Sequence, residues 1–228
     1  MHVLAIENLS FRYAPRGAAD GASWELRVRS LGLDRAEQVL MVSPSGAGKS
    51  TLLNLIAGLL EPAGGTVTIE GQNIHALRGA ARDAFRGRHV GMIFQTFNLL
   101  VGFSALENVM AALLFAGVPE RDHRPRAKAM LERLGIARSD APVEELSVGQ
   151  QQRVAVARAL VCEPALVLAD EPTASLDPAN AHGAMDLIQA VCREKNAALL
   201  CVSHDPSFAA RFRRQEALES AELAGSTA

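Results

Sequence analysis

A short apolar run followed at once by a glycine-rich segment constrains the fold of this chain most strongly. Residues 39–42 (VLMV) are typical of a buried parallel strand, and residues 43–51 (SPSGAGKST) follow directly. Residues 52–60 predict an apolar helix that ends at Glu61-Pro62. Strand, glycine-rich loop and helix in this order form the context that a phosphate-binding loop requires. The sequence therefore predicts a phosphate site within an α/β domain.

The residues of this loop have distinct expected roles. Gly46 and Gly48 let the backbone approach the phosphates, and the N-terminus of the following helix adds its dipole. Lys49 is expected to reach the β- and γ-phosphates, and Ser50 to ligate Mg²⁺. The strict pattern G-x-x-x-x-G-K-[ST] has glycine where this chain has Ser43. The expected phosphate-binding residues are Ser43, Ser45, Gly46, Ala47, Gly48, Lys49, Ser50 and Thr51.

The rest of the chain indicates further strands and helices. Alternating apolar residues predict strands with one buried face near the N-terminus, at residues 3–11 and 24–28. Short apolar runs predict more strands, at residues 66–69, 89–94, 165–169 and 197–202. The pattern is helical at residues 104–162 and 179–192. The polar tail after about Glu216 is expected to fray.

Composition excludes several classes of protein. The 228 residues are 49% hydrophobic, which excludes a disordered, collagen-like or coiled-coil chain. The formal net charge of −2 argues against a nucleic-acid binder held mainly by phosphate contacts. The longest apolar run, residues 109–118, is shorter than the roughly 20 residues of a spanning helix, so any membrane role is expected to come through partners. Three widely spaced cysteines match no metal-site spacing and are expected to be inert thiols in a reducing cytoplasm.

Polar side chains follow three of the predicted strands. Asp170 and Glu171 follow the strand at 165–169, His204 follows the strand at 197–202, and Gln95 ends the strand at 89–94. Ligands of open α/β sheets bind at the carboxyl ends of the strands. Asp170 is expected to hold Mg²⁺, and Glu171 to activate or orient a water molecule. Gln95 can ligate Mg²⁺ or hold water. Taken singly, the residues also fit a solvated acidic turn, a structural histidine and an exposed glutamine.

Residues 146–153 (LSVGQQQR) resemble the signature motif of ABC-type ATPases, whose usual form is Leu-Ser-Gly-Gly-Gln. The family's other motifs are present in its usual order: Tyr13 for adenine stacking, the phosphate loop, Gln95 of the Q-loop, the signature, Asp170-Glu171, residues 175–177 of the D-loop and His204 as the switch histidine. The resemblance covers roughly residues 3–212. Within the family, residues 94–100 (FQTFNLL) and 105–109 (ALENV) are most similar to the lipoprotein-release and macrolide-export type.

The resemblance implies a single ABC-type ATPase domain over residues 1–228. Its fold is expected to be a P-loop ATPase core with a parallel sheet, an N-terminal antiparallel β part and an inserted α-helical subdomain. The expected core lobe covers about 1–95 and 163–215, the helical subdomain about 96–162, and the frayed tail about 216–228.

The resemblance also implies that ATP and Mg²⁺ bind between two copies of the chain arranged head to tail. ATP would lie between Lys49 of one copy and the signature of the other. The implied roles are catalytic for Glu171, His204 and Gln95; metal-binding for Ser50, Gln95 and Asp170; and nucleotide-binding for Tyr13, the loop, Ser147, Gly149, Gln150 and Asp177. The implied partner is an integral membrane permease subunit, which would place the protein at the cytoplasmic face of the inner membrane, and in the cytoplasm when free. No nucleic-acid partner is expected.

Three functions fit these motifs. The favoured one is a transport ATPase that drives a separate membrane protein. The second is an ABC ATPase that drives a membrane regulator of cell division or cell-wall cleavage. The third acts on ribosomes or DNA, but it usually needs two fused ATPase domains or a long coiled-coil insertion, and this chain has neither.

Several residues depart from the usual pattern or suggest a contact. Val148 replaces the first signature glycine, so it is expected to need a negative φ or a side chain that points away. Phe97 and Phe103, just after Gln95, are expected to contact a helix of the membrane subunit. Leu99 and Leu100 fit interior packing equally well.

Overall fold

The computed structural model describes residues 2–13, 23–42, 46–218 and 223–224, in which the strands form two five-stranded sheets. The antiparallel sheet has the order β10-β2-β1-β4-β5, and the sheet of parallel pairs has the order β6-β7-β8-β3-β9. The strands are β1 (Leu4–Tyr13), β2 (Ser23–Leu33), β3 (Gln38–Val42), β4 (Gly64–Ile69), β5 (Gln72–Asn73), β6 (Val90–Ile93), β7 (Leu166–Asp170), β8 (Ala198–Ser203), β9 (Arg214–Ala217) and β10 (Leu223–Ala224).

Helices cover both faces of the parallel sheet. The α-helices are α1 (Lys49–Ile56), α2 (Gly79–His89), α3 (Ala105–Phe115), α4 (Glu120–Arg133), α5 (Val148–Leu160) and α6 (Pro178–Glu194). Short 3₁₀ helices are η1 (Ile74–Ala76), η2 (Val143–Glu145) and η3 (Pro206–Arg211). None of the helices in the described residues is long and apolar enough to cross a membrane.

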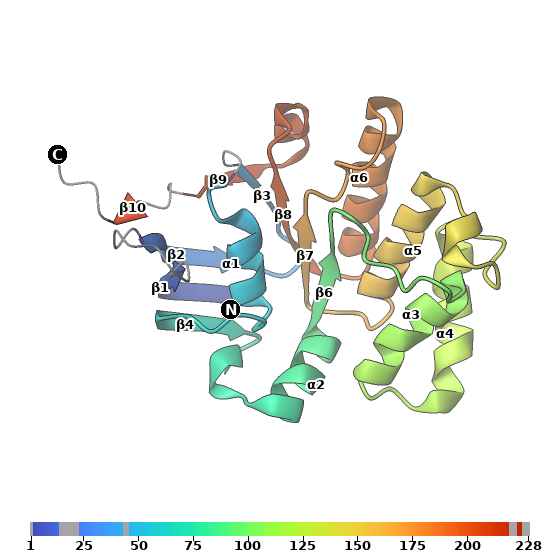
Figure 1. Cartoon of the computed structure of the whole chain (residues 1–228), viewed down its shortest axis with the longest axis horizontal. Helices are drawn as coiled ribbons and strands as arrows, with labels where there is room; N and C mark the ends of the chain where they lie inside the picture. The colour runs from blue at the N-terminus through green and yellow to red at the C-terminus, as the bar shows by residue number, and fades with distance from the viewer. Residues whose placement is uncertain (1, 14–22, 43–45, 219–222, 225–228) are drawn as a thin grey trace.

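The strands of the parallel sheet divide their apolar side chains between two cores. In β7, Leu166 and Leu168 join the core shared with the antiparallel sheet, while Val167 and Ala169 join the core shared with the helices. This alternation follows from the two-residue period of a strand, and burial of both faces explains why the strand is apolar throughout. Helix α1 lies between the two sheets and contributes its apolar residues to the first core (Figure 1).

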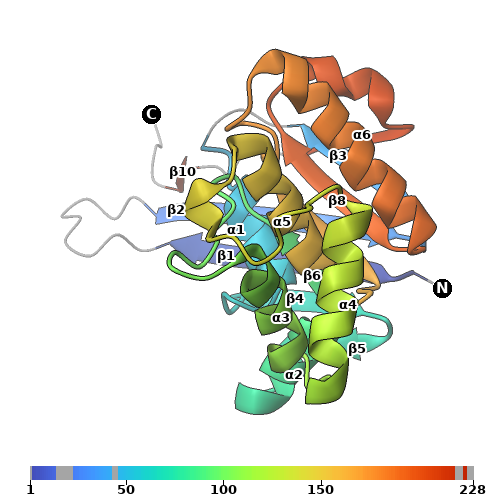
Figure 2. The same ribbon diagram turned by 90° about the vertical axis from the view of Figure 1, so that its right-hand side faces the viewer.

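Helices α3, α4 and α5 lie together on the side of the parallel sheet away from the antiparallel sheet, as Figures 1 and 2 show. Two of them begin with a capping box, at Ser104 with Glu107 in α3 and at Ser147 with Gln150 in α5. Each box satisfies helix N–H groups that lack an intrahelical partner, so it fixes where the helix begins.

The mixed α/β fold with one parallel and one antiparallel sheet confirms the fold predicted from the sequence. The observed elements differ from the predicted ones in three places. Helix α1 begins earlier and ends earlier than expected, because its C-cap Ala57 is followed by Gly58 at φ 68°, and the chain turns there instead of continuing to residue 60. Helix α2 was not predicted, because its residues are mostly polar or small and none of them is fully buried; its Phe85 is only partly buried against the core.

The third difference concerns the chain after residue 212. Fraying was expected from about residue 216, yet β9 pairs in parallel with β3 as far as Ala217, and Leu218 is buried in the core. The two residues of β10 pair with Ser23 and Trp24 of β2. Residues 214–218 are therefore held by backbone pairing with β3 and by burial of Leu218. Their polar composition does not predict a strand.

Candidate functional site

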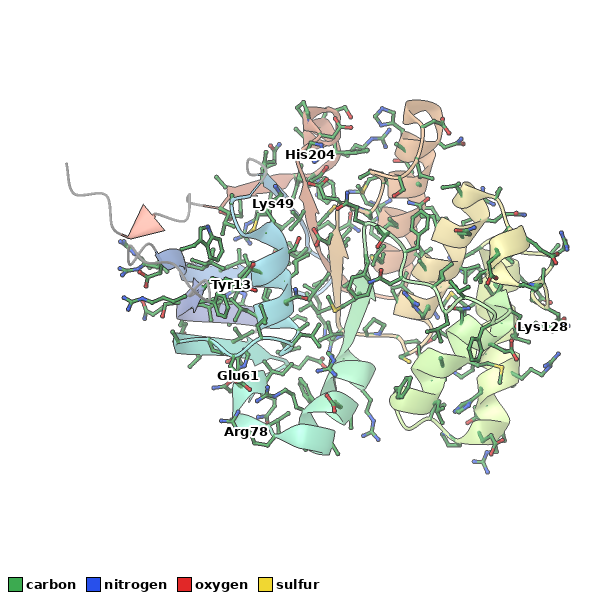
Figure 3. The ribbon with its side chains drawn as sticks, in the orientation of Figure 1. Tyr13, Lys49, Glu61, Arg78, Lys128 and His204 are labelled. Carbon is green, nitrogen blue, oxygen red and sulfur yellow. The ribbon has the colours of Figure 1, made fainter. Side chains whose placement is uncertain are left out.

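A cleft of about 450 Å³ opens at the carboxyl ends of β3, β6 and β7. Tyr13 comes from β1, Lys49 begins α1, and both lie on the same side of the molecule as His204, which follows β8 (Figure 3). Among the described residues, the cleft is lined by Tyr13, Trp24, Gly46, Gly48, Lys49, Ser50, Thr51, Gln95, Asp170 and Glu171.

The N-terminal end of α1 forms the floor of this cleft. Gly48 is the N-cap residue, at φ 93°, and no side chain among the described residues caps its helix. The first turn of α1 contains no acidic residue, and Lys49 is 8% exposed. A helix N-terminus without a capping side chain from Gly48, the positive end of the helix dipole and a buried lysine together suit an anionic ligand. The predicted loop residues Ser43 and Ser45 lie outside the described residues.

Asp170 and Ser50 provide the oxygen groups of the cleft. The Ser50 hydroxyl, in the first turn of α1, lies near the Asp170 carboxylate at the end of β7, and both line the cleft. Burial raises the pKa of Asp170 above its usual range, the charge of Glu171 adds to this, and Ser50 and Lys49 oppose it. A carboxylate and a hydroxyl are hard oxygen ligands, so these two residues, with the amide of Gln95 beside them in the cleft, fit Mg²⁺.

Glu171 is held in place from three directions. Its backbone N–H donates to the Val202 carbonyl at 3.0 Å, and its own φ is 45°, a conformation rare for a residue with a side chain. Its carboxylate accepts the His204 backbone N–H at 3.1 Å and contacts His204 Nδ1 at 2.7 Å. Lys49 Nζ lies 4.0 Å from the same oxygen, Oε1. Such backbone strain persists only where the surrounding structure fixes it, which is common at active sites.

The predicted D-loop contacts the predicted Q-loop. Ser175 Oγ donates to the backbone carbonyl of Gln95 at 2.9 Å. Asp177 does not line the cleft in the described residues; its carboxylate caps α6 by accepting the Asn180 N–H at 3.1 Å. Within one copy of the chain, Asp177 therefore stabilises a helix start, and its predicted nucleotide contact stays a prediction.

The predicted signature residues lie at the N-terminus of α5 and do not line the described part of the cleft. Val148 is the first helical residue and does not have a positive φ; its side chain is 50% exposed. A Cβ built on Gly149 would meet no atom within 4 Å, so the backbone there is open to an approaching group. The valine therefore meets the expected backbone condition for this position.

Two residues near the site were not singled out from the sequence. Gln152 is buried, and its Nε2 donates to the Pro172 carbonyl at 2.8 Å, which joins α5 to the segment after Glu171. Trp24 lines the cleft next to Tyr13, its cross-strand partner in the pairing of β1 with β2. The two-residue period of β2 gave one signal for Trp24, because it places Trp24 on the same face as the buried Leu26.

The segment after Gln95 corrects the expectation for Phe97. Phe97 is only 6% exposed, so it packs in the interior, whereas Phe103 is 49% exposed. Phe97 and Asn98 both have a positive φ, and Arg158 donates to their carbonyls at 2.7 and 2.6 Å. Burial lowers the pKa of Arg158, whose guanidinium replaces the backbone partners that this turn lacks.

The chain belongs to the ABC transporter family, whose model matches residues 26–174. It is 41% identical over 214 residues to the lipoprotein-releasing system ATP-binding protein LolD of Chromohalobacter salexigens, a match that covers 93% of this chain and 88% of that protein. The LolD protein of Hydrogenovibrio crunogenus is 43% identical over 196 residues, which are 86% of this chain and 82% of the relative.

Solved structures agree with this assignment. A dimeric post-hydrolysis structure of the ATP-binding cassette MJ0796 with ADP and Pi has a TM-score of 0.80 and 30% identity, and it covers 97% of this chain and 96% of its own. CbiO1 from Clostridium perfringens, part of the transporter complex cbiONQ, has a TM-score of 0.74 and 29% identity over 90% of this chain and 79% of its own. The predicted family and ATPase activity are confirmed: this chain is the ATP-binding, ATP-hydrolysing subunit of an ABC transporter.

Proposed function

We propose that this ATPase powers the release of lipoproteins from a membrane by a separate membrane subunit. The observation that carries the proposal is 41–43% identity to LolD proteins over most of both chains. The proposed location is peripheral, at the cytoplasmic face of the inner membrane.

In the proposed mechanism, each residue of the cleft has one task. Lys49 and the N–H groups at the start of α1 hold the phosphates, and Tyr13 stacks on the base. Ser50, Asp170 and Gln95 hold Mg²⁺, which neutralises phosphate charge when bound. Glu171 accepts the proton of the attacking water, and His204 fixes the orientation of the Glu171 carboxylate through its 2.7 Å contact.

The proposed active form is a head-to-tail dimer. Ser147, Gly149 and Gln150 begin α5, and the helix N-terminus suits the γ-phosphate of a nucleotide held by the other copy. Exposure of Val148 and the open space at Gly149 support such a contact. ATP binding would close the dimer, and hydrolysis would open it.

Glu171→Gln tests the catalytic role. The amide keeps the size of the side chain but cannot accept the proton, so kcat should fall by about 100-fold or more while ATP still binds. Steady-state hydrolysis, ATP titration and size-exclusion chromatography with light scattering measure the three effects, and a dimer should accumulate with ATP. Glu132→Gln is the matched control, because Glu132 is 61% exposed on α4 and should leave every value unchanged. Normal turnover of Glu171→Gln would remove Glu171 from the proposed role.

The proposed membrane subunit contacts a groove beside the helical part of the chain. The groove has a volume of about 320 Å³ and lies between α2, β6, α3 and α5. Phe115, at its edge, is 74% exposed, and the neighbouring Leu114 is 63% exposed. Adjacent exposed apolar side chains at a groove suit an apolar helix face of a partner.

Phe115→Glu tests this contact. Retention on membranes that contain the partner should fall, while hydrolysis by the isolated chain stays normal, because Phe115 does not line the nucleotide cleft. Leu59→Glu is the control, since Leu59 is an exposed apolar residue (48%) beyond the end of α1. Equal retention of both variants would place the partner elsewhere.

A further inference from the structure

Trp24 is the only tryptophan of the chain, and it lies in the nucleotide cleft. In the antiparallel register of β1 and β2, Trp24 is directly opposite Tyr13. Opposed residues of an antiparallel pair point to the same face of the sheet. The hairpin therefore brings two aromatic side chains to the same wall of the cleft, although no local motif marks the second one.

The indole of Trp24 also lies against the phosphate-binding end of α1. A Cβ built on Gly48 would be 2.5 Å from Cζ2 and Cη2 of Trp24, so the ring edge occupies the space that a side chain would need there. Trp24 is half-buried and packs against the apolar core between the sheets. The core thus supports the ring from behind, and the exposed remainder lines the cleft.

This position lies between the two ends of a bound nucleotide. With the phosphates at Gly48 and Lys49, the base must lie along the same wall to reach Tyr13. Tyr13 is 61% exposed, so much of its ring is open to a stacking partner. An indole fixed beside it adds apolar contact area, and a purine gains more from such contact than a pyrimidine because its π-surface is larger.

We propose that Trp24 is a second aromatic contact for the base and ribose of the nucleotide, and that it favours purine over pyrimidine nucleotides. The proposal rests on the proposed phosphate and base contacts of Lys49 and Tyr13. Trp24 contributes to binding in every nucleotide state, so its loss raises Kd and KM without changing kcat.

Intrinsic fluorescence of the unmodified protein gives the first test. Because the chain has a single tryptophan, ADP should change its emission, whereas inorganic pyrophosphate, which has no base, should bind the phosphate end with little change. Calorimetry of the same samples shows whether each compound binds. An emission change of equal size with pyrophosphate and ADP would overturn the base contact.

Trp24→Leu and Trp24→Phe give the second test, with Phe85→Leu as a matched control. Phe85 is also partly buried and packs on the same core, but it does not line the cleft. For Trp24→Leu we expect Kd for ADP to rise about tenfold, Kd for CDP about threefold and Kd for pyrophosphate less than about twofold, with kcat at saturating ATP unchanged. Trp24→Phe should regain most of the ADP affinity, and Phe85→Leu should keep all three values.

The outcomes separate this inference from the proposed function. If Trp24→Leu raises Kd for ADP, CDP and pyrophosphate by the same factor, Trp24 only supports the loop and the inference is wrong. The same holds if ADP affinity is unchanged. If the unmodified protein binds neither ADP nor pyrophosphate, the proposed phosphate site fails, and the inference fails with it. Thermal unfolding of each variant shows whether it is folded; the fluorescence test needs no variant.

Discussion

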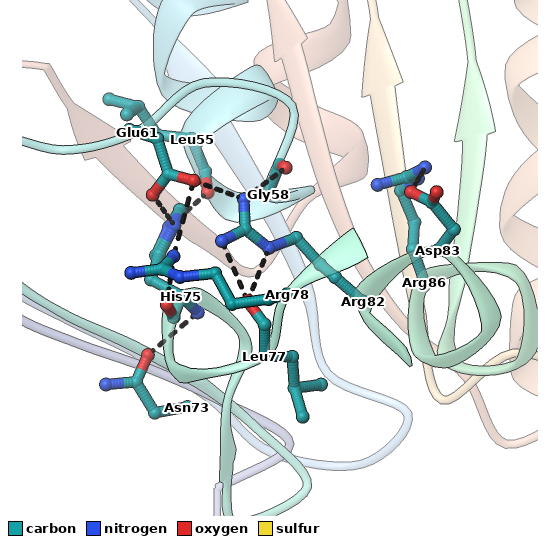
Figure 4. A network of polar contacts seen from close by, with 10 residues as sticks. All are labelled: Leu55, Gly58, Glu61, Asn73, His75, Leu77, Arg78, Arg82, Asp83 and Arg86. Carbon is teal, nitrogen blue, oxygen red and sulfur yellow. Dashed lines mark hydrogen bonds and ion pairs between the residues drawn. The ribbon is translucent and has the colours of Figure 1, made fainter. Parts of the chain in front are cut away.

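The two ends of helix α1 differ in how their backbone groups are satisfied. At the N-terminal end, Gly48 provides no capping side chain, and no acidic residue in the first turn pairs with the N–H groups. At the C-terminal end, His75 Nε2 lies 2.9 Å from the Leu55 carbonyl, and Arg82 Nη1 donates to the Gly58 carbonyl at 3.4 Å (Figure 4).

Side chains from α2 and its N-cap residue, Arg78, form further hydrogen bonds and an ion pair around the C-terminal end of α1. Arg82 also donates to the Leu77 carbonyl through Nε at 3.0 Å and Nη2 at 2.8 Å, and it pairs with Glu61. Arg78 donates to the His75 carbonyl at 2.9 Å, so the cluster binds η1, α2 and the turn after α1 together (Figure 4).

The comparison shows how one helix serves both stability and binding. Cationic groups near a helix C-terminus complement the negative end of the dipole, and here the protein supplies them itself. The positive end has no anionic partner from the first turn, so a bound phosphate can fill that place. Substitutions at the two ends should therefore affect different properties.

The largest effect is expected from Lys49→Ala at the N-terminal end. Removing a buried cation from the phosphate site should weaken ATP binding by about 100-fold, or about 3 kcal/mol, and leave the helix largely intact. Calorimetric titration with ATP measures the effect. Lys128→Ala is the control, since Lys128 is exposed on α4, far from Lys49 in Figure 3. Unchanged ATP affinity of Lys49→Ala would contradict the assignment of the two ends.

Arg82→Ala should give the opposite result. It leaves the Leu77 carbonyl without its two Arg82 hydrogen bonds, so the free energy of unfolding should fall by about 2 kcal/mol. Nucleotide affinity should stay within about twofold, because Arg82, which lies on α2, contacts the C-terminal end of α1 and not its nucleotide-binding N-terminus. Urea unfolding and ADP titration measure the two properties. Arg86→Ala is the matched control, because Arg86 is also on α2 but pairs with Asp83 of the same helix. An equal loss of stability in both variants would show that any arginine of α2 has this effect.

The smallest effect is the pH dependence that His75 adds. Burial lowers the pKa of His75 below its ordinary value of 6.5, although the Leu55 carbonyl and Glu61 oppose this shift. As the pH falls below 6.5, the unfolded chain therefore binds a proton before the folded one, and stability present at higher pH is lost. The hydrogen bond from Arg82 lowers the pKa of Glu61, so the contribution of Glu61 is lost only below its ordinary value of 4.5.

Urea unfolding between pH 7.5 and 5.5 tests the His75 contribution. The free energy of unfolding should decrease toward pH 5.5 by at most about 1.4 kcal/mol per pH unit, and less steeply in His75→Gln. Leu59→Gln is the control, because Leu59 is exposed and neither side chain titrates, so the pH dependence should stay as it is. The same slope in the unmodified protein and in His75→Gln would show that other groups cause it.

Much of the site could be predicted because its residues are close in the chain or follow strand ends. The order of strand, glycine-rich loop and helix indicated the phosphate site, and Asp170, Glu171 and His204 follow apolar strands that parallel pairing aligns. Ser147 and Gln150 are three residues apart, which is the spacing of the capping box that begins α5. Local physics sets all of these features: strand period, loop conformation and helix capping.

Other features depend on packing between distant segments. Helix α2 is polar overall and reaches the core only through partly buried side chains such as Phe85. The interior position of Phe97 depends on a turn whose carbonyls are held by Arg158, some 60 residues away in the chain. Apolar residues after Gln95 gave no sign of which would be buried, because both burial and partner contact favour apolar side chains.

The sequence by itself determined the class of protein, the phosphate-binding segment and the strand ends that carry the acidic groups. Only the tertiary structure decided that His204 contacts Glu171, that Ser175 holds the Gln95 carbonyl, and that Trp24 covers Gly48. The physical reason is that these contacts join residues 24 to 80 positions apart. Their geometry is set by how the two sheets and the helices pack, and no local pattern contains that information.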